Sequence, residues 1–320
     1  IANATGCSSI YGGSIPSTPY KVPWANSLFE DNAEFAYGML TSYKQKRKQI
    51  KTIMTSSMEA VTKEVQDIFT HWLENKEDFM ITYKIKEQLK NAEIPKDLSD
   101  LLDYIPARSV WAIGGDGWAY DIGFGGIDHV LSSNENIKIL VLDTEVYSNT
   151  GGQMSKSSKV GQVAEFADYG KRNAKKDLFK IAMSYSNCYV ASICLGANFQ
   201  QTIKAFKEAD AHEGPAIIIA YAPCVEHGIK GGLSCTTEEQ KLAVEVGYQL
   251  LMRYNPLEEK LYLDSKEPNF DEYEKFLDNE TRYHALKIKD QNLANILLNE
   301  NKQNAIKRYK EYKEKSTNHC

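Results

Sequence analysis

Residues 109–117 read SVWAIGGDG, and residues 137–153 read IKILVLDTEVYSNTGGQ. Each stretch begins with a short apolar run of the kind that forms a buried strand, and each continues into a polar loop. Similar strand patterns occur at residues 189–194 and 216–221, and a helical pattern over residues 199–209 separates these two. This alternation of strands and helices predicts an α/β fold with a mostly parallel sheet flanked by helices.

The composition excludes several classes of protein. The chain has 320 residues, of which 42% are hydrophobic and 25% are charged, so it is not a wholly disordered chain. The net charge is −5, which argues against a globally basic protein that binds nucleic acid. The most apolar stretch, residues 216–225, is much shorter than the ~20 residues that cross a bilayer. We therefore expect neither nucleic acid nor a membrane as a partner.

The sequence divides into four predicted regions. Residues 1–26 are rich in Gly, Ser, Pro and Asn and predict a loop segment. Residues 27–105 show helical spacing of apolar residues and predict a helical N-terminal insertion. Residues 106–255 contain the strand–helix alternation, and residues 256–320 predict a helical C-terminal tail. Because the chain starts at Ile1 without a signal-like segment, we expect it to be part of a longer protein.

The six cysteines are spread along the chain without a C-x-x-C pair. This pattern favours reduced thiols and hence a cytoplasmic or cytosol-like reducing compartment. Cys188 and Cys194 fall in or beside a strand pattern, which predicts core positions. Cys235 and Cys320 suggest no role.

The glycine-rich turn after the first strand fits neither common nucleotide-binding motif. The G-x-G-x-x-G fingerprint would need a glycine where Tyr120 stands, and the G-x-x-x-x-G-K-[ST] loop is absent. Gly115 and Gly117 would let the backbone approach a phosphate. Asp116 between them would repel that phosphate unless a cation lay between the two. The turn therefore indicates Mg2+, which prefers oxygen ligands.

The loop after the second strand offers further oxygen ligands. Because the C-terminal ends of neighbouring parallel strands meet at one edge of a sheet, this loop is expected to face Asp116. It supplies the Thr144 hydroxyl, backbone carbonyls and the Asn149 amide. Either motif alone could be an ordinary turn or connector, whereas the two together favour a metal–pyrophosphate site.

These motifs resemble the pyrophosphate-binding half of thiamine diphosphate enzymes. The individual residues in the motifs resemble those of pyruvate:ferredoxin (flavodoxin) oxidoreductases. The stretches that carry the resemblance are residues 4–12, 27–34, 115–123, 143–153 and 221–224. The general thiamine motif ends in Asn-Asn, where this chain has Asp-Thr at positions 143 and 144. That departure points to the oxidoreductases rather than to decarboxylases and synthases. The resemblance runs from residue 1 to about 260 and continues weakly to the end.

The resemblance implies a thiamine diphosphate-binding fold and roles for individual residues. Mg2+ would be bound by Asp116, Thr144 and the Val146 carbonyl. Asn149 falls where the family places a polar side chain near the reacting centre. Cys7 and Cys224 match two of the four cysteines that hold a [4Fe-4S] cluster. Thiamine diphosphate would be held by the two loops, through Gly115, Asp116, Gly117, Trp118, Thr144, Glu145, Val146, Tyr147, Ser148 and Asn149.

The resemblance also implies an activity. The family converts pyruvate and coenzyme A to acetyl-CoA and CO2, and passes electrons through the cluster to ferredoxin, flavodoxin or a fused NADP reductase domain. Further implied partners are the rest of a longer chain and a second copy in a homodimer. We expect this segment alone to be inactive, because the pyrimidine-binding domain and two cluster cysteines are not in it. Two alternatives stay open: a non-catalytic cofactor-binding or assembly module, and a cluster-free thiamine-dependent lyase or synthase.

Two further groups of polar residues carry weaker signals. A basic run comprises Lys171, Arg172, Lys175 and Lys176. We interpret it as a solvated face, with a docking site for an acidic electron carrier as the alternative. His227 is interpreted as a structural histidine, because no spacing here matches a zinc site.

Overall fold

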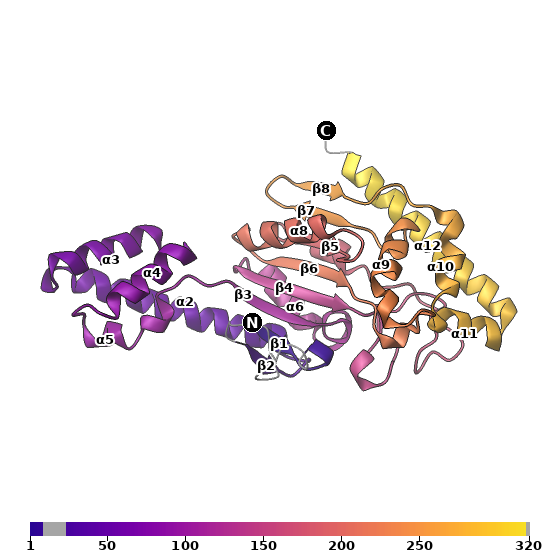
Figure 1. Ribbon diagram of the computed structural model, residues 1–320, viewed down its shortest axis with the longest axis horizontal. Coiled ribbons are helices and arrows are strands. Elements are labelled where there is room, and N and C mark those ends of the chain that lie inside the picture. The colour runs from indigo at the N-terminus through magenta and orange to yellow at the C-terminus, as the bar shows by residue number, and fades with distance from the viewer. Residues whose placement is uncertain (9–23, 318–320) are drawn as a thin grey trace. The chain divides into compact units, whose positions relative to one another are not determined.

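The computed structural model describes residues 1–8 and 24–317, and within them it contains an eight-stranded sheet surrounded by helices (Figure 1). The strand order is β2-β1-β3-β4-β6-β5-β7-β8. The bounds are β1 (Ala2–Ala4), β2 (Ala25–Ser27), β3 (Val110–Gly115), β4 (Ile137–Asp143), β5 (Tyr189–Ile193), β6 (Ala216–Tyr221), β7 (Met252–Asn255) and β8 (Lys260–Leu263). Strand β6 pairs in parallel with β4 and β5, and β1 does so with β2 and β3, whereas β7 is antiparallel to β5 and β8. The predicted mostly parallel α/β sheet is confirmed.

The helices occupy segments between the strands and the C-terminal part of the described chain. Their bounds are α2 (Asn32–Ser56), α3 (Lys63–Asn75), α4 (Phe79–Leu89), α5 (Lys96–Ser99), α6 (Phe124–Ser132), α7 (Leu178–Ala182), α8 (Phe199–Ala211), α9 (Thr236–Glu245), α10 (Tyr273–Asp278), α11 (Thr281–Lys289) and α12 (Gln291–Thr317). A π-helix, η3 (Gly117–Ile122), precedes α6. None of the helices in the described residues is both long and apolar enough to cross a lipid bilayer.

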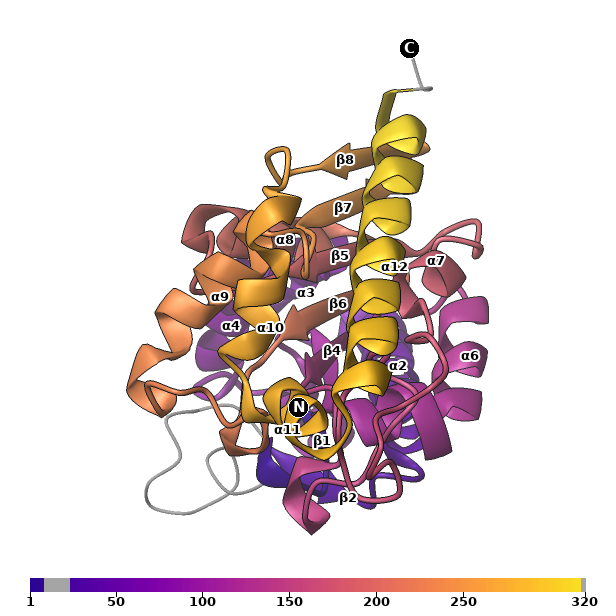
Figure 2. The same cartoon turned by 90° about the vertical axis from the view of Figure 1, so that its right-hand side faces the viewer.

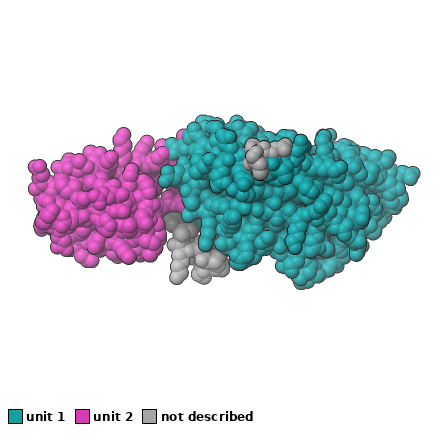
Figure 3. Space-filling model, turned by 90° about the horizontal axis from the view of Figure 1, so that it is seen from above, with its two compact units in different colours: residues 1–36, 111–320 teal, residues 37–110 magenta. Residues whose placement is uncertain are grey.

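The chain forms two compact units (Figure 3). Unit 1 comprises residues 1–36 and 111–320 and contains the sheet, and unit 2 comprises residues 37–110. Unit 2 is helical, and its helix starts follow from its sequence. Thr62 caps α3 by accepting a hydrogen bond from the Val65 amide, and Asp78 caps α4 by accepting one from the Ile81 amide.

The apolar side chains of β5 and β6 alternate between the two faces of the sheet, as a pleated strand requires. Tyr189, Ala191 and Ile193 of β5 pack with Ala205 and Ala209 of α8 on one face. Figures 1 and 2 show α8 beside these strands. Because both strands are buried throughout most of their length, they read as continuous apolar runs in the sequence.

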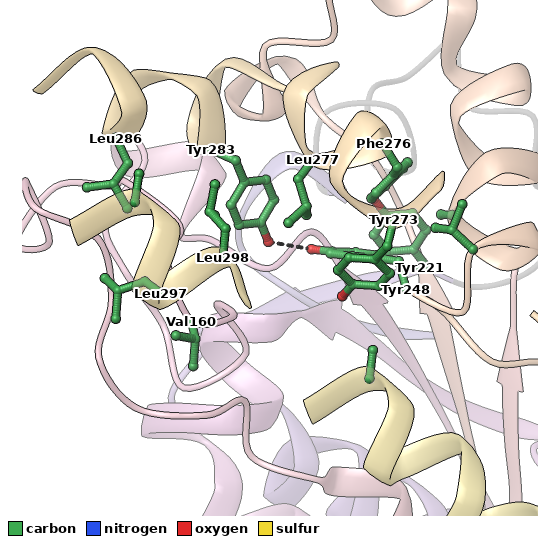
Figure 4. Close-up of a cluster of buried hydrophobic side chains, with 14 of the residues drawn as sticks. Val160, Tyr221, Tyr248, Tyr273, Phe276, Leu277, Tyr283, Leu286, Leu297 and Leu298 are labelled. Carbon is green, nitrogen blue, oxygen red and sulfur yellow. Dashed lines mark hydrogen bonds between the residues drawn. The ribbon is translucent and has the colours of Figure 1, made fainter. Parts of the chain in front are cut away.

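The C-terminal helices α10, α11 and α12 pack on the rest of unit 1 through a second apolar cluster (Figure 4). The cluster combines tyrosine and aliphatic side chains, among them Tyr221 from β6 and Tyr248 from the segment before β7. The hydroxyls of Tyr248 and Tyr283 lie 2.7 Å apart and are hydrogen-bonded. The C-terminal tail is therefore part of the core of unit 1.

Two predicted region boundaries differ from the structure. The predicted start of the C-terminal tail at residue 256 falls between β7 and β8, which are neighbours in one sheet. The predicted loop over residues 1–26 contains β1 and part of β2, while residues 9–23 lie outside the described part of the chain. The sequence pattern for these two strands is weak because β1 and β2 are three residues each, built from Ala, Asn and Ser rather than from strand-forming residues.

Candidate functional site

The first polar group of the site is Asp116, which directly follows β3 and is almost fully buried. The glycines around it are required by close packing. A Cβ on Gly114 would lie 2.4 Å from the Trp118 ring, and a Cβ on Gly117 would lie 2.3 Å from the Tyr147 ring. The π-helix then begins at Gly117, a type of turn that is frequent at functional sites.

The second group comes from the loop after β4, the neighbour of β3 in the sheet. Thr144 Oγ1 lies 2.7 Å from Asp116 Oδ1 and 2.9 Å from the Val146 carbonyl oxygen. The structure thus brings together the carboxylate, hydroxyl and carbonyl oxygens that the sequence nominated as Mg2+ ligands. An all-oxygen set of this kind suits Mg2+.

Asp116 has a further partner that the sequence interpretation missed. Ser155 Oγ donates to Asp116 Oδ2 over 2.7 Å and itself accepts a hydrogen bond from the Ser157 amide. Burial, followed by the nearby Asp143 carboxylate, nevertheless raises the pKa of Asp116 to about 7. A cation at these oxygens would favour the ionised carboxylate, so the residues present fit the implied metal.

Asp143, the last residue of β4, links the two loops to a buried lysine. Its Oδ2 accepts hydrogen bonds from the Tyr120 hydroxyl at 2.9 Å and from Lys175 Nζ at 2.5 Å. Burial alone would lower the pKa of Lys175, but the carboxylates of Asp143 and Glu145 raise it. The lysine is thus held as a cation inside unit 1.

The interpretation of the basic run as a solvated face is therefore wrong. Lys171 is buried, and its ammonium donates to the Ser158 carbonyl at 2.5 Å. Lys176 is half-buried over the Phe124 ring, and only Arg172 of the four side chains is exposed. Lys171 and Lys175 donate to partners inside unit 1, so the four residues do not form one continuous exposed basic surface.

Glu145 is the one predicted cofactor-binding residue of this loop whose side chain is paired with buried cations. The residue is fully buried, and its carboxylate lies 2.9 Å from Lys175 Nζ and 3.0 Å from Arg282 Nη1. Burial would raise the pKa of Glu145, but the surrounding cations hold it well below its usual range. The side chain points into the interior because its charge is satisfied there.

The other predicted cofactor-binding residues line the same loops. Trp118 is buried, and its indole Nε1 has no hydrogen-bond partner among the described residues. Tyr147 and Ser148 are half-buried, and Asn149 is exposed. Asn149 lies beside the N-terminal segment, since a Cβ on Gly6 would be 3.8 Å from Asn149 Cγ. The predicted residues therefore share one region, while their roles stay predictions.

The two predicted cluster cysteines both lie on segments that contact the loop after β4. Cys7 Sγ is 3.6 Å from Ser148 Oγ. Cys224 follows β6, whose Tyr221 is in register with Asp143, and the Ala222 amide donates to the Asp143 carbonyl. Burial raises the pKa of the Cys224 thiol. Within residues 1–8 and 24–317 no three His, Cys, Asp or Glu side chains are placed together to hold a metal ion.

His227 has a structural place, as the sequence interpretation held. The ring is fully buried, and its Nε2 lies 2.8 Å from the Thr144 carbonyl oxygen. Its Nδ1 lies 3.5 Å from Glu280 Oε1. The histidine therefore connects the Cys224 segment to the Thr144 loop.

Comparison with known proteins adds a family to this geometry. Residues 100–220 match the family described as thiamine pyrophosphate enzyme, C-terminal TPP binding domain. Thiamine pyrophosphate (TPP) is another name for thiamine diphosphate. The chain is 45% identical to the pyruvate-flavodoxin oxidoreductase of Klebsiella pneumoniae and 45% identical to the pyruvate:ferredoxin oxidoreductase of Moorella thermoacetica. It is 42% identical to the mitochondrial pyruvate dehydrogenase [NADP(+)] of Euglena gracilis.

Each of these matches covers 98% of this chain, but only 28%, 29% and 18% of the respective relatives. The chain thus spans less than a third of the length of these proteins. The matched domain includes both site loops. Residues 100–220 therefore match a C-terminal TPP-binding domain, and nearly the whole chain is similar to one part of the longer pyruvate:ferredoxin (flavodoxin) oxidoreductases.

Proposed function

We propose that this chain is the part of a pyruvate oxidoreductase that binds the pyrophosphate of TPP through Mg2+ and holds one side of a [4Fe-4S] cluster. The observation that carries the proposal is the position of Thr144 Oγ1, within 3 Å of both Asp116 Oδ1 and the Val146 carbonyl oxygen. These oxygens come from the ends of adjacent strands, where ligands of open parallel sheets bind.

The chain's own residues have defined tasks in this proposal. Asp116 supplies the negative charge among the Mg2+ ligands, and Ser155 fixes the orientation of its carboxylate. Gly117 keeps the backbone free of a side chain where the Tyr147 ring lies against it. Asn149, whose side chain is exposed on the same loop, would contact the substrate in this proposal. The chemistry that TPP supplies when bound is a carbanion for attack on the 2-oxoacid carbonyl and an electron sink for decarboxylation.

Cys7 and Cys224 supply two of the four cluster thiolates in this proposal. Their segments contact the same loop, so a cluster held by both would lie near the TPP site. The complete protein would use pyruvate and coenzyme A, and its acceptor would be ferredoxin, flavodoxin or a fused NADP reductase domain. It would be a homodimer in a cytosol-like reducing compartment, in keeping with cysteines that form no disulfide among the described residues.

The activity is tested on the complete protein, purified without oxygen. We expect pyruvate-dependent reduction of a viologen dye that requires coenzyme A, TPP and Mg2+. Asp116→Ala should abolish both this reaction and Mg2+-dependent TPP binding measured by calorimetry. Glu165→Gln, an exposed change in the neighbouring loop, is the matched control and should leave both unchanged. Release of CO2 without dye reduction would instead indicate a cluster-free lyase, and wild-type TPP affinity in Asp116→Ala would contradict the site assignment.

The cluster is tested by electron paramagnetic resonance of the reduced complete protein. Cys224→Ser should alter the cluster spectrum while leaving Mg2+–TPP affinity nearly intact, because Cys224 is not one of the proposed Mg2+ ligands. Cys235→Ser is the control, as Cys235 is a partly exposed thiol with no proposed role. An unaltered spectrum in Cys224→Ser would exclude it as a ligand.

A further inference from the structure

Glu145 has a backbone conformation that is uncommon for a residue with a side chain. Its φ is +60°, in the left-handed region, and it stands between the proposed ligands Thr144 and Val146. For a residue other than glycine this conformation is sterically unfavourable, because the Cβ comes close to the following carbonyl oxygen. Such strain persists only where the surrounding structure imposes it, and it is concentrated at functional sites.

The left-handed turn has a direct geometric effect on the site. In an extended chain, the side chains of successive residues point to opposite sides. Here the chain folds back at Glu145, and the Val146 carbonyl oxygen comes within 2.9 Å of Thr144 Oγ1. The turn is therefore what brings two of the three proposed Mg2+ ligands together.

The backbone of Glu145 is held in this conformation by three hydrogen bonds. Its amide donates to Asp143 Oδ1 over 3.2 Å. Its carbonyl oxygen accepts from Ser158 Oγ at 2.6 Å and from Gln162 Nε2 at 3.0 Å. Ser158 and Gln162, the two side chains that donate to this carbonyl, are themselves buried, so water does not compete with them.

The side chain is held by groups from distant parts of the sequence. Arg282, at the start of α11, lies 3.0 Å from one Glu145 carboxylate oxygen, and Lys175 lies 2.9 Å from the other. Arg282 also donates to the Tyr248 hydroxyl, which in turn donates to Glu145. Tyr248 is hydrogen-bonded to Tyr283 inside the C-terminal cluster, as Figure 4 shows. The C-terminal helices thus anchor the Thr144–Val146 loop.

We propose that Glu145 is a positioning residue for the Mg2+ site: its backbone hydrogen bonds and the ion pair of its side chain with Arg282 together hold the left-handed conformation, so that the Thr144 hydroxyl and the Val146 carbonyl converge on one metal ion. This inference rests on the proposed function, which assigns those two groups as ligands. In this proposal α11 contributes to cofactor binding indirectly, through the ion pair of Arg282 with Glu145, although no residue of that helix is a proposed ligand.

The proposal predicts a change in metal preference as well as in affinity. Mg2+ demands near-ideal octahedral geometry at short distances, whereas Ca2+ accepts longer and more irregular coordination. A loop released from its anchor should therefore lose affinity for Mg2+ more than affinity for Ca2+. A merely structural role would lower protein stability without changing the ratio of the two affinities.

The test uses the complete protein and measures Mg2+ and Ca2+ affinities by calorimetry at a fixed, saturating TPP concentration. Glu145→Gly keeps the left-handed backbone conformation accessible and removes the carboxylate that pairs with Arg282 and Lys175. It therefore separates the contribution of the side chain from that of the backbone conformation. We expect Mg2+ affinity to fall about 10–100-fold, the usual range for outer partners of metal ligands, and the Mg2+/Ca2+ ratio to fall with it. Glu165→Gln is the matched control for the loss of an exposed carboxylate.

Arg282→Lys is the milder second variant, because it keeps the charge and loses the planar fork. We expect about a tenfold loss of Mg2+ affinity, together with faster hydrogen exchange of the amides at residues 144–147. The exposed Arg172→Lys is its control. The hydrogen-exchange measurement needs no ligand. It therefore reports how firmly residues 144–147 are held even in a variant that binds no cofactor.

The outcomes separate this proposal from the one on which it rests. If the wild-type protein binds no Mg2+–TPP, the proposed function fails, whatever the variants do. If the wild type binds, and Glu145→Gly and Arg282→Lys retain its Mg2+ affinity, Mg2+/Ca2+ ratio and loop exchange, only the positioning role is overturned.

Discussion

The core of unit 2 differs from the part of the interior of unit 1 that lies beside the candidate site. The core of unit 2 is apolar and comes from side chains at helical spacing, such as Ile50, Phe69 and Trp72. The interior of unit 1 beside the candidate site contains buried charges, including Glu145 and Arg282, which are far apart in the sequence. The difference shows that one chain can use local apolar periodicity for architecture and long-range charge pairing for its functional loops.

These two kinds of interior respond differently to mutation. Removing apolar atoms costs their transfer free energy plus the free energy of the cavity left behind. Removing one member of a buried ion pair leaves an uncompensated charge, which is costly even where the pair itself adds little net stability. The comparison is therefore open to direct measurement.

The largest effect is expected from Lys175→Met. This change leaves Asp143 without its ammonium partner and removes one of the two close cations from Glu145. We expect a loss of about 3–5 kcal/mol in the free energy of unfolding of unit 1, measured by urea denaturation. Arg172→Met, three residues earlier and exposed, should change it by less than about 0.5 kcal/mol. A loss below about 1 kcal/mol in Lys175→Met would show that the buried pair behaves like a surface pair.

The fold was predictable where periodicity was strong. The strands β3, β4, β5 and β6 are apolar runs, and the helices of unit 2 show both apolar spacing and capping residues such as Thr62 and Asp78. The strands β7 and β8 were not predicted. They are four residues each, contain charged side chains such as Arg253 and Lys260, and depend on partners elsewhere in the sheet.

The site was predictable only in part. The spacing of Asp116 and Thr144 at strand ends was sufficient to place them together, because the topology of parallel sheets is restrictive. The contacts of Lys175 and Arg282 with Glu145 could not be derived from one sequence, since nothing local pairs these positions. The signal that could have helped is the serine-rich stretch 155–158, whose hydroxyls bond Asp116, Asp143 and the Glu145 carbonyl.

The next effect is expected from Ile50→Ala in the apolar core of unit 2. Ile50 is fully buried, and this truncation leaves a cavity, with an expected loss of about 2–5 kcal/mol. Hydrogen–deuterium exchange should accelerate in peptides of α2 and α3, while Mg2+–TPP affinity stays unchanged. The adjacent exposed Lys51→Ala serves as the control. Loss of TPP affinity in Ile50→Ala would contradict the view that this core serves architecture alone.

A smaller, pH-dependent effect is expected from Glu239→Gln in α9. Burial, followed by the nearby Glu280 carboxylate, raises the pKa of Glu239 from 4.5 to about 7. The folded state therefore holds a proton that the unfolded state releases between these pH values, so this group lowers stability as pH rises through that window. Glutamine does not titrate, and the stability of Glu239→Gln relative to wild type should increase between pH 5 and pH 8 by about 1 kcal/mol.

Thermal unfolding across that pH range measures the Glu239 effect. The exposed neighbour Glu238→Gln is the matched control and should show no such trend. A constant difference between Glu239→Gln and wild type at all pH values would mean that the carboxyl is ionised normally in the folded protein.

The smallest effects are expected from replacing two glycines by alanine, one in α2 of unit 2 and one near Asp116 in unit 1. Gly38 lies on the exposed side of α2, and a Cβ there would meet no atom within 4 Å. Because glycine lowers helix stability relative to alanine, Gly38→Ala should stabilise the protein by about 0.5–1 kcal/mol. Gly114→Ala should do the opposite, since its Cβ would lie 2.4 Å from the Trp118 ring and 2.8 Å from the Ala4 Cβ. Urea denaturation of both variants measures the contrast, and a stabilising Gly114→Ala would show that the packing beside Asp116 is as adaptable as a helix surface.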